Sequence, residues 1–261
     1  MKNANKTYRQ CTMKQTIRLG RGYECCQAEV EAVVARFDSG GNTVHDGRNT
    51  IKTFDTSRGQ WNVKRYHRPS LLNRVVYTFL RKPKGLRAFT YPERVLAAGF
   101  ETPAPVAYVE QRHAGLLDYS FFISEQCPYG RRFYEFGDAS VDDCRDIVKA
   151  FARFTAGLHE AGIYHRDYSP GNILFDQVDG EWHFSIVDIN RMEFGLVDIV
   201  KGCANFARLW GQPEWFVQLA SDYAAARGAD PQECIRLVLE ARAKFWKPRA
   251  RHFNLPYTLR F

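Results

Sequence analysis

The chain of 261 residues lacks the features that would place it in several common classes of protein. No run approaches the ~20 apolar residues that a membrane-spanning helix requires. No apolar stretch follows the charges of Met1–Lys6, so we expect no secretory signal peptide. The seven cysteines, at positions 11, 25, 26, 127, 144, 203 and 234, show neither C-x-x-C nor histidine spacing. This scatter argues against a zinc site or a disulfide framework and favours a reducing cytosol.

Acidic residues are missing from two long stretches. Thr56 to Pro92 contains nine Lys or Arg and no Asp or Glu, which exceeds the net charge of +8 for the whole chain. Ala241 to Phe261 also has no acidic residue and carries six Lys or Arg between aromatic side chains. The positive charge of the protein is therefore concentrated rather than spread.

The most informative stretch is His165-Arg166-Asp167-Tyr168-Ser169-Pro170-Gly171-Asn172. It matches H-R-D-x-x-x-x-N, the catalytic loop of the protein-kinase fold. Asp167 could accept the proton of an attacking hydroxyl, and Asn172 could hold Mg²⁺ from the same loop. Asp188 follows the apolar, strand-like run Phe184–Val187 and supplies a second candidate metal ligand. Mg²⁺ is suited by a small number of oxygen ligands from the protein, because phosphate and water complete its coordination shell.

A kinase also needs a lysine on a strand of its small lobe, to hold the α- and β-phosphates of the nucleotide. Lys64 lies near the middle of Gln60–Tyr66, a predicted strand, and 103 residues before Asp167. Before it, Val44 to Lys52 predicts a strand, a tight turn and a second strand. Gly47 in that turn could bring backbone amides to the phosphates, although it lies outside a G-x-G-x-x-G motif and an ordinary hairpin turn is the alternative.

The phosphate lysine is expected to pair with a glutamate on a helix. Glu93 is the single acidic residue between Asp55 and Glu101 and lies in the predicted helix Leu86–Ala98. Pro92 favours a position in the first turn of that helix. A surface glutamate near a helix N-terminus is the alternative interpretation of Glu93.

Several segments together resemble the lipopolysaccharide kinase (Kdo/WaaP) family over about residues 40 to 210. They are Val44-His45-Asp46-Gly47-Arg48-Asn49, Val63-Lys64, Gly99-Phe100-Glu101-Thr102-Pro103-Ala104-Pro105, the catalytic loop, and Val187-Asp188-Ile189-Asn190-Arg191. The chain has Asp-Ile-Asn where protein kinases have Asp-Phe-Gly, and it has no Ala-Pro-Glu element. These departures argue against a protein kinase with a regulated activation segment. The family's helix glutamate falls nearer Thr90, one helical turn before Glu93 on the same face.

The resemblance implies an ATP- and Mg²⁺-dependent kinase that phosphorylates a core sugar of lipopolysaccharide, Kdo or heptose. It implies Asp167 as the catalytic base, Asn172 and Asp188 as Mg²⁺ ligands, and Lys64 as the phosphate lysine. A small-molecule or protein kinase of the same fold is the alternative enzyme. A catalytically silent, kinase-like binding module is the alternative from another class, and the presence of all four residues argues against it.

The acid-free stretches allow three interpretations: a surface for anionic lipid and phosphorylated glycolipid, a nucleic-acid surface, or an amphipathic helix packed on the small lobe with solvated charges. Ser70 to Lys82 has apolar residues at helical spacing. We favour the lipid interpretation, with Arg74, Arg81, Lys82 and Lys84 facing the membrane, and expect no nucleic-acid partner. The partners are then a lipopolysaccharide or lipid A-core glycolipid and an anionic membrane. The protein would be cytoplasmic and peripheral at the inner face of the cytoplasmic membrane.

The predicted fold is α+β, a two-lobed protein-kinase-like fold with a small β-rich N-lobe and a mainly helical C-lobe. We expect one domain over residues 1–261, with the N-lobe at about 30–124 and the C-lobe at about 125–261. Residues 1–30 are poorly periodic, and Glu29–Phe37 is predicted as a strand. Further strands are expected at Val106–Val109 and Phe121–Ser124, and Glu125-Gln126-Cys127 would then form the hinge that binds adenine. Helices are predicted at Asp142–Gly162, Gln212–Arg227 and Pro231–Trp246.

Overall fold

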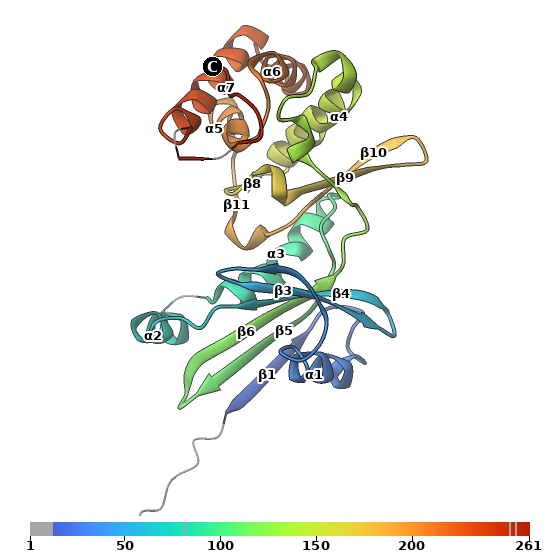
Figure 1. The fold of residues 1–261 in the computed structure, drawn as a ribbon, viewed down its shortest axis with the longest axis vertical. Coiled ribbons are helices and arrows are strands. Elements are labelled where there is room, and N and C mark those ends of the chain that lie inside the picture. Colours follow the sequence, from blue (N-terminus) through green and yellow to red (C-terminus); the bar gives the residue numbers. More distant parts are fainter. Residues whose placement is uncertain (1–12, 81, 251, 254) are drawn as a thin grey trace, which may run out of the picture. The chain divides into compact units, whose positions relative to one another are not determined.

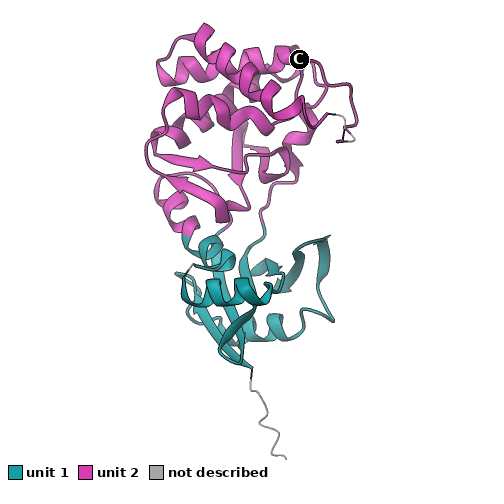
Figure 2. Cartoon of the chain, turned by 90° about the vertical axis from the view of Figure 1, so that its left-hand side faces the viewer, with its two compact units in different colours: residues 1–90, 104–126 teal, residues 91–103, 127–261 magenta. Residues whose placement is uncertain are grey.

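The computed structural model describes residues 13–80, 82–250, 252–253 and 255–261 (Figure 1). It divides into two compact units, shown in Figure 2: unit 1 consists of residues 1–90 and 104–126, and unit 2 of residues 91–103 and 127–261. The prediction of a single domain stays a prediction. Some residues named in the sequence predictions lie outside the described residues. They are Met1–Lys6, Cys11, Arg81 and Arg251.

The described part of unit 1 is built on a six-stranded sheet in which every neighbouring pair is antiparallel. Across the sheet the strands are β1 (Lys14–Leu19), β5 (Pro105–His113), β6 (Leu116–Glu125), β4 (Gly59–Tyr66), β3 (Thr50–Thr56) and β2 (Asn42–Asp46). The strands predicted around Lys52, Lys64, Val106 and Phe121 are confirmed. The strand β1 lies in the segment that showed no clear periodicity.

One prediction in unit 1 is wrong: Glu29–Phe37 is not a strand. The segment forms the helix α1 (Gln27–Ala35), which packs on the sheet (Figure 1). Its buried side chains are Val30, Val33, Val34 and, just past its end, Phe37. These positions are separated by three, four and seven residues, which is the spacing of one helix face. Burial of this face against the sheet outweighs the weak strand propensity of the β-branched valines.

Two more helices follow β4. The helix α2 (Leu71–Phe79) packs beside β6, and α3 (Lys84–Ala97) continues from unit 1 into unit 2. Pro92 lies in the interior of α3, so its predicted position in the first turn is wrong. The helix instead begins directly after Pro83, whose carbonyl accepts the amide N–H of Arg87 at 3.2 Å. Pro83 is thus the proline that marks the start of this helix.

The described part of unit 2 is mainly helical. Its helices are α4 (Val141–Glu160), α5 (Ile199–Asn205), α6 (Pro213–Arg227) and α7 (Pro231–Trp246), with 3₁₀ turns η1 (Phe133–Phe136), η2 (Pro170–Asn172), η3 (Ile189–Arg191) and η4 (Phe206–Arg208). Its strands are β7 (Arg131–Arg132), β8 (Ile163–His165), β9 (Ile173–Val178), β10 (Glu181–Ile186) and β11 (Met192–Phe194). The helices predicted at Asp142–Gly162, Gln212–Arg227 and Pro231–Trp246 are confirmed. They could be predicted because local residues mark their starts and ends: Asp230 caps α7, and Gly228 ends α6 in the left-handed conformation.

An aromatic core supports the β9–β10 hairpin of unit 2. Phe133, Phe151, Phe175 and Phe184 are buried, and the ring centroids of Phe133 and Phe151 lie 4.1 Å apart. Phe175 and Phe184 are opposite each other in the antiparallel pairing of β9 with β10. The hairpin is therefore fixed on the helical core. Asn172 directly precedes β9 and Asp188 follows β10, so both lie at the open end of the hairpin.

Candidate active site

His165 ties the predicted catalytic loop to the chain that precedes Asp188. Its Nδ1 accepts the amide N–H of Asp167 at 3.0 Å, so Nε2 carries the proton and donates to the carbonyl of Val187 at 3.0 Å. Burial lowers the pKa of His165, which keeps the ring neutral and able to make both bonds. The histidine of the motif is thus a structural link between two segments of unit 2.

The three predicted phosphoryl-transfer residues of unit 2 lie together. Asn172 donates from Nδ2 to the carbonyl of Asp167 at 2.8 Å, and its own carbonyl accepts the amide N–H of Val187 at 3.0 Å. These bonds put Asp167, Asn172 and Asp188 at the open end of the β9–β10 hairpin. Asn172 Nδ2 is used within the loop, so Oδ1 is the atom that could ligand a cation.

Asp188 has a backbone conformation that few residues adopt. Its φ and ψ are 55° and 41°, in the left-handed region, and it directly precedes η3. Its Oδ1 accepts a hydrogen bond from Asn190 Nδ2 at 2.5 Å. Non-glycine residues in this region cost free energy and occur preferentially at functional sites. The Asp-Ile-Asn sequence therefore forms a turn in which its own asparagine orients the aspartate.

Two arginines surround the carboxylate of Asp167. Arg208 Nη1 donates to Oδ1 at 2.5 Å, and Arg191 Nη1 lies 3.8 Å from Oδ2. The Asp167 side chain retains 25% of its accessible surface, so it is reachable from solvent. Arg191 belongs to the quoted Asp-Ile-Asn-Arg segment, but sequence reasoning gave it no role. Arg208 carries no sequence signal, because η4 brings it to the loop from 41 residues away.

A chain of buried hydrogen bonds supports the loop from behind. Asn205 donates from Nδ2 to the carbonyl of His165 at 2.9 Å, so its Oδ1 accepts from His159 Nε2 at 3.0 Å. His159 Nδ1 in turn accepts the hydroxyl proton of Tyr223 at 2.8 Å, and Arg227 donates to that hydroxyl at 2.7 Å. Burial lowers the pKa of His159 to about 4. Sequence reasoning missed this chain, because its members come from α4, α5 and α6.

The predicted phosphate residues of unit 1 lie on its sheet. Lys64 is half-buried in β4, opposite Ile51 of β3 and Phe122 of β6, and its Nζ lies 5.5 Å from the ring centroid of Tyr66. Gly47 lies in the β2–β3 turn, where its amide N–H donates to the carbonyl of Asn49 at 3.3 Å. Gly47 thus lies in the ordinary hairpin turn that was the alternative interpretation. The contact of this turn with phosphate stays a prediction.

Glu93 is exposed on α3 and belongs to unit 2, whereas Lys64 and Thr90 belong to unit 1. The boundary between the units crosses α3 between Thr90 and Tyr91. The pairing of Glu93 with Lys64 stays a prediction.

The predicted hinge lies where the chain passes from one unit to the other, between Gln126 and Cys127. The amide N–H of Glu125 donates to the carbonyl of Ala104 at 3.0 Å and that of Gln126 to the carbonyl of Gln60 at 2.9 Å, so both extend the pairing at the end of β6. The Glu125 carboxylate accepts the hydroxyl of Tyr23. Burial raises the pKa of the Cys127 thiol, which is therefore neutral at physiological pH. Adenine binding by Glu125 and Cys127 stays a prediction.

Two features of the described residues bear on metal and membrane binding. Within the described ranges, no three His, Cys, Asp or Glu side chains form a metal-binding cluster. The predicted Mg²⁺ set differs in kind, since it consists of one amide and one carboxylate. Over the same ranges, no helix combines the length and apolar character needed to span a membrane.

Comparison with known proteins decides the family. A profile of the lipopolysaccharide kinase (Kdo/WaaP) family matches residues 41–210, which is well over half of the chain. The chain belongs to this lipopolysaccharide kinase family. The matched segment includes Lys64, the catalytic loop, Asp188 and Arg208. The resemblance seen in the sequence is confirmed.

This chain has the same fold as a solved structure of WaaP in complex with acyl carrier protein. The two chains share 17% identity with a TM-score of 0.58, over 92% of this chain and 100% of that one. The predicted α+β, kinase-like fold is confirmed. The family assignment and the fold together support the prediction that the chain is a phosphotransferase.

Two curated protein kinases match shorter segments. Calcium/calmodulin-dependent protein kinase type IV of Mus musculus is 33% identical over 116 residues, which is 44% of this chain and 21% of that protein. Serine/threonine-protein kinase cds1 of Schizosaccharomyces pombe is 31% identical over 70 residues, 27% of this chain and 14% of that protein. The chain thus spans about a fifth or less of the length of these relatives.

Proposed function

We propose that the chain transfers the γ-phosphate of ATP to a hydroxyl of a core sugar of lipopolysaccharide, Kdo or heptose. The family assignment supports the acceptor class, and one observation carries the chemistry: Asp167, Asn172 and Asp188 lie together on bonded segments of unit 2. A reaction of this type needs a base for the hydroxyl and ligands for a phosphate-bound cation. Asp167 is the candidate base, and Asn172 and Asp188 are the candidate ligands, at the end of one hairpin.

Asp167 is proposed to take the proton of the acceptor hydroxyl. The hydroxyl oxygen forms a bond to the γ-phosphorus, the bond to the β,γ-bridging oxygen breaks, and ADP leaves. Asn172 Oδ1 and the Asp188 carboxylate are proposed to hold Mg²⁺, which would offset the charge of the phosphates. The side chains of Asn172 and Asp188 fit that ion because both supply oxygen ligands and are oriented by hydrogen bonds. Asn172 Nδ2 donates to the carbonyl of Asp167, and Asn190 donates to the carboxylate of Asp188.

The charge around Asp167 supports an anionic acceptor. Arg208 contacts Oδ1 and Arg191 lies near Oδ2, while Arg166 in the same loop is half-exposed and pairs with Glu193. Guanidinium groups bind carboxylate and phosphate in a bidentate geometry. Kdo carries a carboxylate, so these arginines suit such a sugar better than a neutral alcohol.

Residues of unit 1 complete the proposal. Lys64 would hold the α- and β-phosphates of ATP, with Glu93 as its partner, and the Gly47 turn would cover the phosphates. The segment Glu125 to Cys127 would receive adenine. A lipid A-core acceptor would put the protein at the inner face of the cytoplasmic membrane, where the net charge of +8 would favour an anionic surface.

The direct test incubates the purified chain with ATP, Mg²⁺ and a delipidated core oligosaccharide, and follows the acceptor by mass spectrometry. The parent should add one phosphate, and Asp167→Asn should abolish transfer while nucleotide binding and thermal stability are kept. Asp179→Asn is the matched control, because Asp179 is exposed in the β9–β10 turn. Nucleotide binding without transfer to any core sugar would indicate a binding module and refute the proposal.

A further inference from the structure

The helix α2 carries its apolar side chains outward. Leu71, Leu72 and Phe79 are 73%, 78% and 73% exposed, Val75 is 43% exposed, and Leu80 at the C-terminal end is 81% exposed. At 100° per residue the first four fall within one arc of about 100° on the helix. Such an arc normally faces a protein core. The interpretation in which the apolar face packs on the small lobe is therefore wrong.

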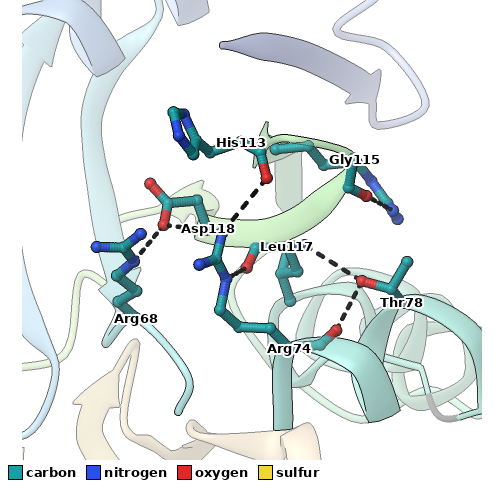
Figure 3. Close-up of polar contacts among 8 residues, drawn as sticks. Arg68, Arg74, Thr78, His113, Gly115, Leu117 and Asp118 are labelled. Atoms are coloured by element: carbon teal, nitrogen blue, oxygen red, sulfur yellow. Dashed lines mark hydrogen bonds and ion pairs between the residues drawn. The ribbon is translucent and has the colours of Figure 1, made fainter. Parts of the chain in front are cut away.

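The opposite side of α2 is anchored by polar contacts (Figure 3). Arg74 is 5% exposed and donates from Nε to the carbonyl of Leu117 at 2.6 Å, and from Nη2 to that of His113 at 3.4 Å. Its Nη2 also lies 3.6 Å from the buried carboxylate of Asp118, which Arg68 contacts as well. The expectation that Arg74 faces lipid is thus wrong. The guanidinium holds the helix to the β5–β6 hairpin.

Thr78, one turn further along α2, strengthens the same attachment. Its hydroxyl donates to the carbonyl of Arg74 at 2.6 Å and accepts the amide N–H of Leu117 at 3.2 Å. Rolling the helix to bury its leucines would leave Asp118 without Arg74 and expose the hairpin amide. A buried charge or polar group that loses its partner is strongly destabilising. The polar contacts therefore force the apolar arc to face outward.

Positive charge flanks this arc on both sides in the sequence. Arg68 precedes the helix and is about half-exposed, and Lys82 follows it and is exposed. No acidic residue occurs from Thr56 to Pro92. An apolar helix face with basic neighbours is the composition of helices that lie in the interface of anionic membranes.

We propose that α2 is a membrane-docking helix whose outward apolar arc, Leu71, Leu72, Val75 and Phe79, inserts between the head groups of an anionic bilayer. The proposal deepens the proposed function, on which it rests for the location of the acceptor, because a lipid A-core glycolipid is presented at a bilayer surface. A second copy of the chain is a poorer occupant. A helix of nine residues is about 14 Å long, too short to supply the ~800 Å² per partner of a stable interface.

The test measures binding of the full chain to vesicles of phosphatidylethanolamine and phosphatidylglycerol, by sedimentation. Leu72→Ser with Phe79→Ser should lower the partition coefficient at least about tenfold, because insertion of even one large apolar side chain contributes that much. The matched control, Val178→Ser with Val217→Ser, removes two exposed valines from unit 2 and should bind like the parent. Thermal unfolding should be unchanged in both, since all four residues are exposed.

Hydrogen exchange of the same samples shows where the lipid binds. Vesicles should slow exchange of amides in Leu71–Phe79 of the parent and leave the β9–β10 turn unchanged. Equal vesicle binding by the parent and the Leu72/Phe79 variant would overturn the proposal. So would a parent that is dimeric in solution and becomes monomeric in the variant with no change in vesicle binding, or binding to vesicles of phosphatidylcholine alone that equals binding to the anionic ones.

Activity on a soluble acceptor separates failure of this proposal from failure of the proposed function. The Leu72/Phe79 variant should phosphorylate the delipidated core oligosaccharide at the parent rate, and should be impaired with vesicle-borne glycolipid. If the parent lacks transferase activity but the vesicle results hold, the proposed function fails and the docking helix stands. If transfer is normal but both acceptors are used equally by the variant, the docking helix fails alone.

Discussion

Acidification should destabilise unit 2 through His159. The ring is 2% exposed and burial lowers its pKa from 6.5 to about 4. The unfolded chain therefore takes up a proton as the pH falls through 6.5, while the folded protein takes it up only near pH 4. Stability from the neutral ring is complete above pH 6.5 and is lost between these two values. The full difference corresponds to about 3 kcal/mol at 1.36 kcal/mol per pKa unit.

The measurement compares the parent with His159→Gln, which keeps a hydrogen-bonding side chain but cannot titrate. Urea unfolding is followed by tryptophan fluorescence, because Trp182, Trp210, Trp215 and Trp246 lie in unit 2. From about pH 7 to about pH 4.5 the free energy of unfolding of the parent should fall by about 2 kcal/mol more than that of the variant. The comparison cancels the contribution of other groups, including His165, whose pKa burial also lowers.

The matched control is His252→Gln, since His252 is exposed and should leave the pH dependence of the parent unchanged. Equal losses of stability in the parent and His159→Gln would refute the reasoning, because the ring would then titrate alike in both states. The same titration should be visible in turnover. His159 positions the catalytic loop through Asn205, so activity should be lost as the pH falls toward about 4, where the folded ring takes up its proton.

Three further predictions follow from the site and its support. Asp188→Asn should weaken nucleotide binding in the presence of Mg²⁺ and leave binding without Mg²⁺ nearly unchanged, as measured by calorimetry; an unaltered affinity with Mg²⁺ would remove it from the metal site. Lys64→Ala should lower activity at least about a hundredfold, or roughly 3 kcal/mol, and adding Glu93→Gln should cost nothing more if the two form one unit, whereas additive losses would separate them. Gly202→Ala should destabilise the protein by about 1–3 kcal/mol and so lower its melting temperature, because the added Cβ would overlap the hydroxyl of Tyr223, which donates to His159. Gly130→Ala has open space around its added Cβ and should be nearly neutral. Equal melting temperatures for the two variants would contradict the packing described.

Local patterns predicted much of the fold, because the interactions that set them are close in sequence. The helix Pro231–Trp246 begins with a proline directly after a capping aspartate, and its predicted bounds agree with the structure. The catalytic loop closes on itself within eight residues, so the motif alone placed Asp167 next to Asn172.

The sequence by itself determined the family, the catalytic loop and the period of each amphipathic segment. Tertiary structure decided which face of a segment is buried. In α2 the helical spacing was clear, but a periodic pattern does not say whether its partner is a protein core or lies outside the protein. The buried guanidinium of Arg74 decides this, because turning Leu71 and Leu72 inward would take it away from the carbonyl of Leu117 and from Asp118. Arg208 reached Asp167 in the same way, through a packing of η4 that no neighbouring residue could reveal.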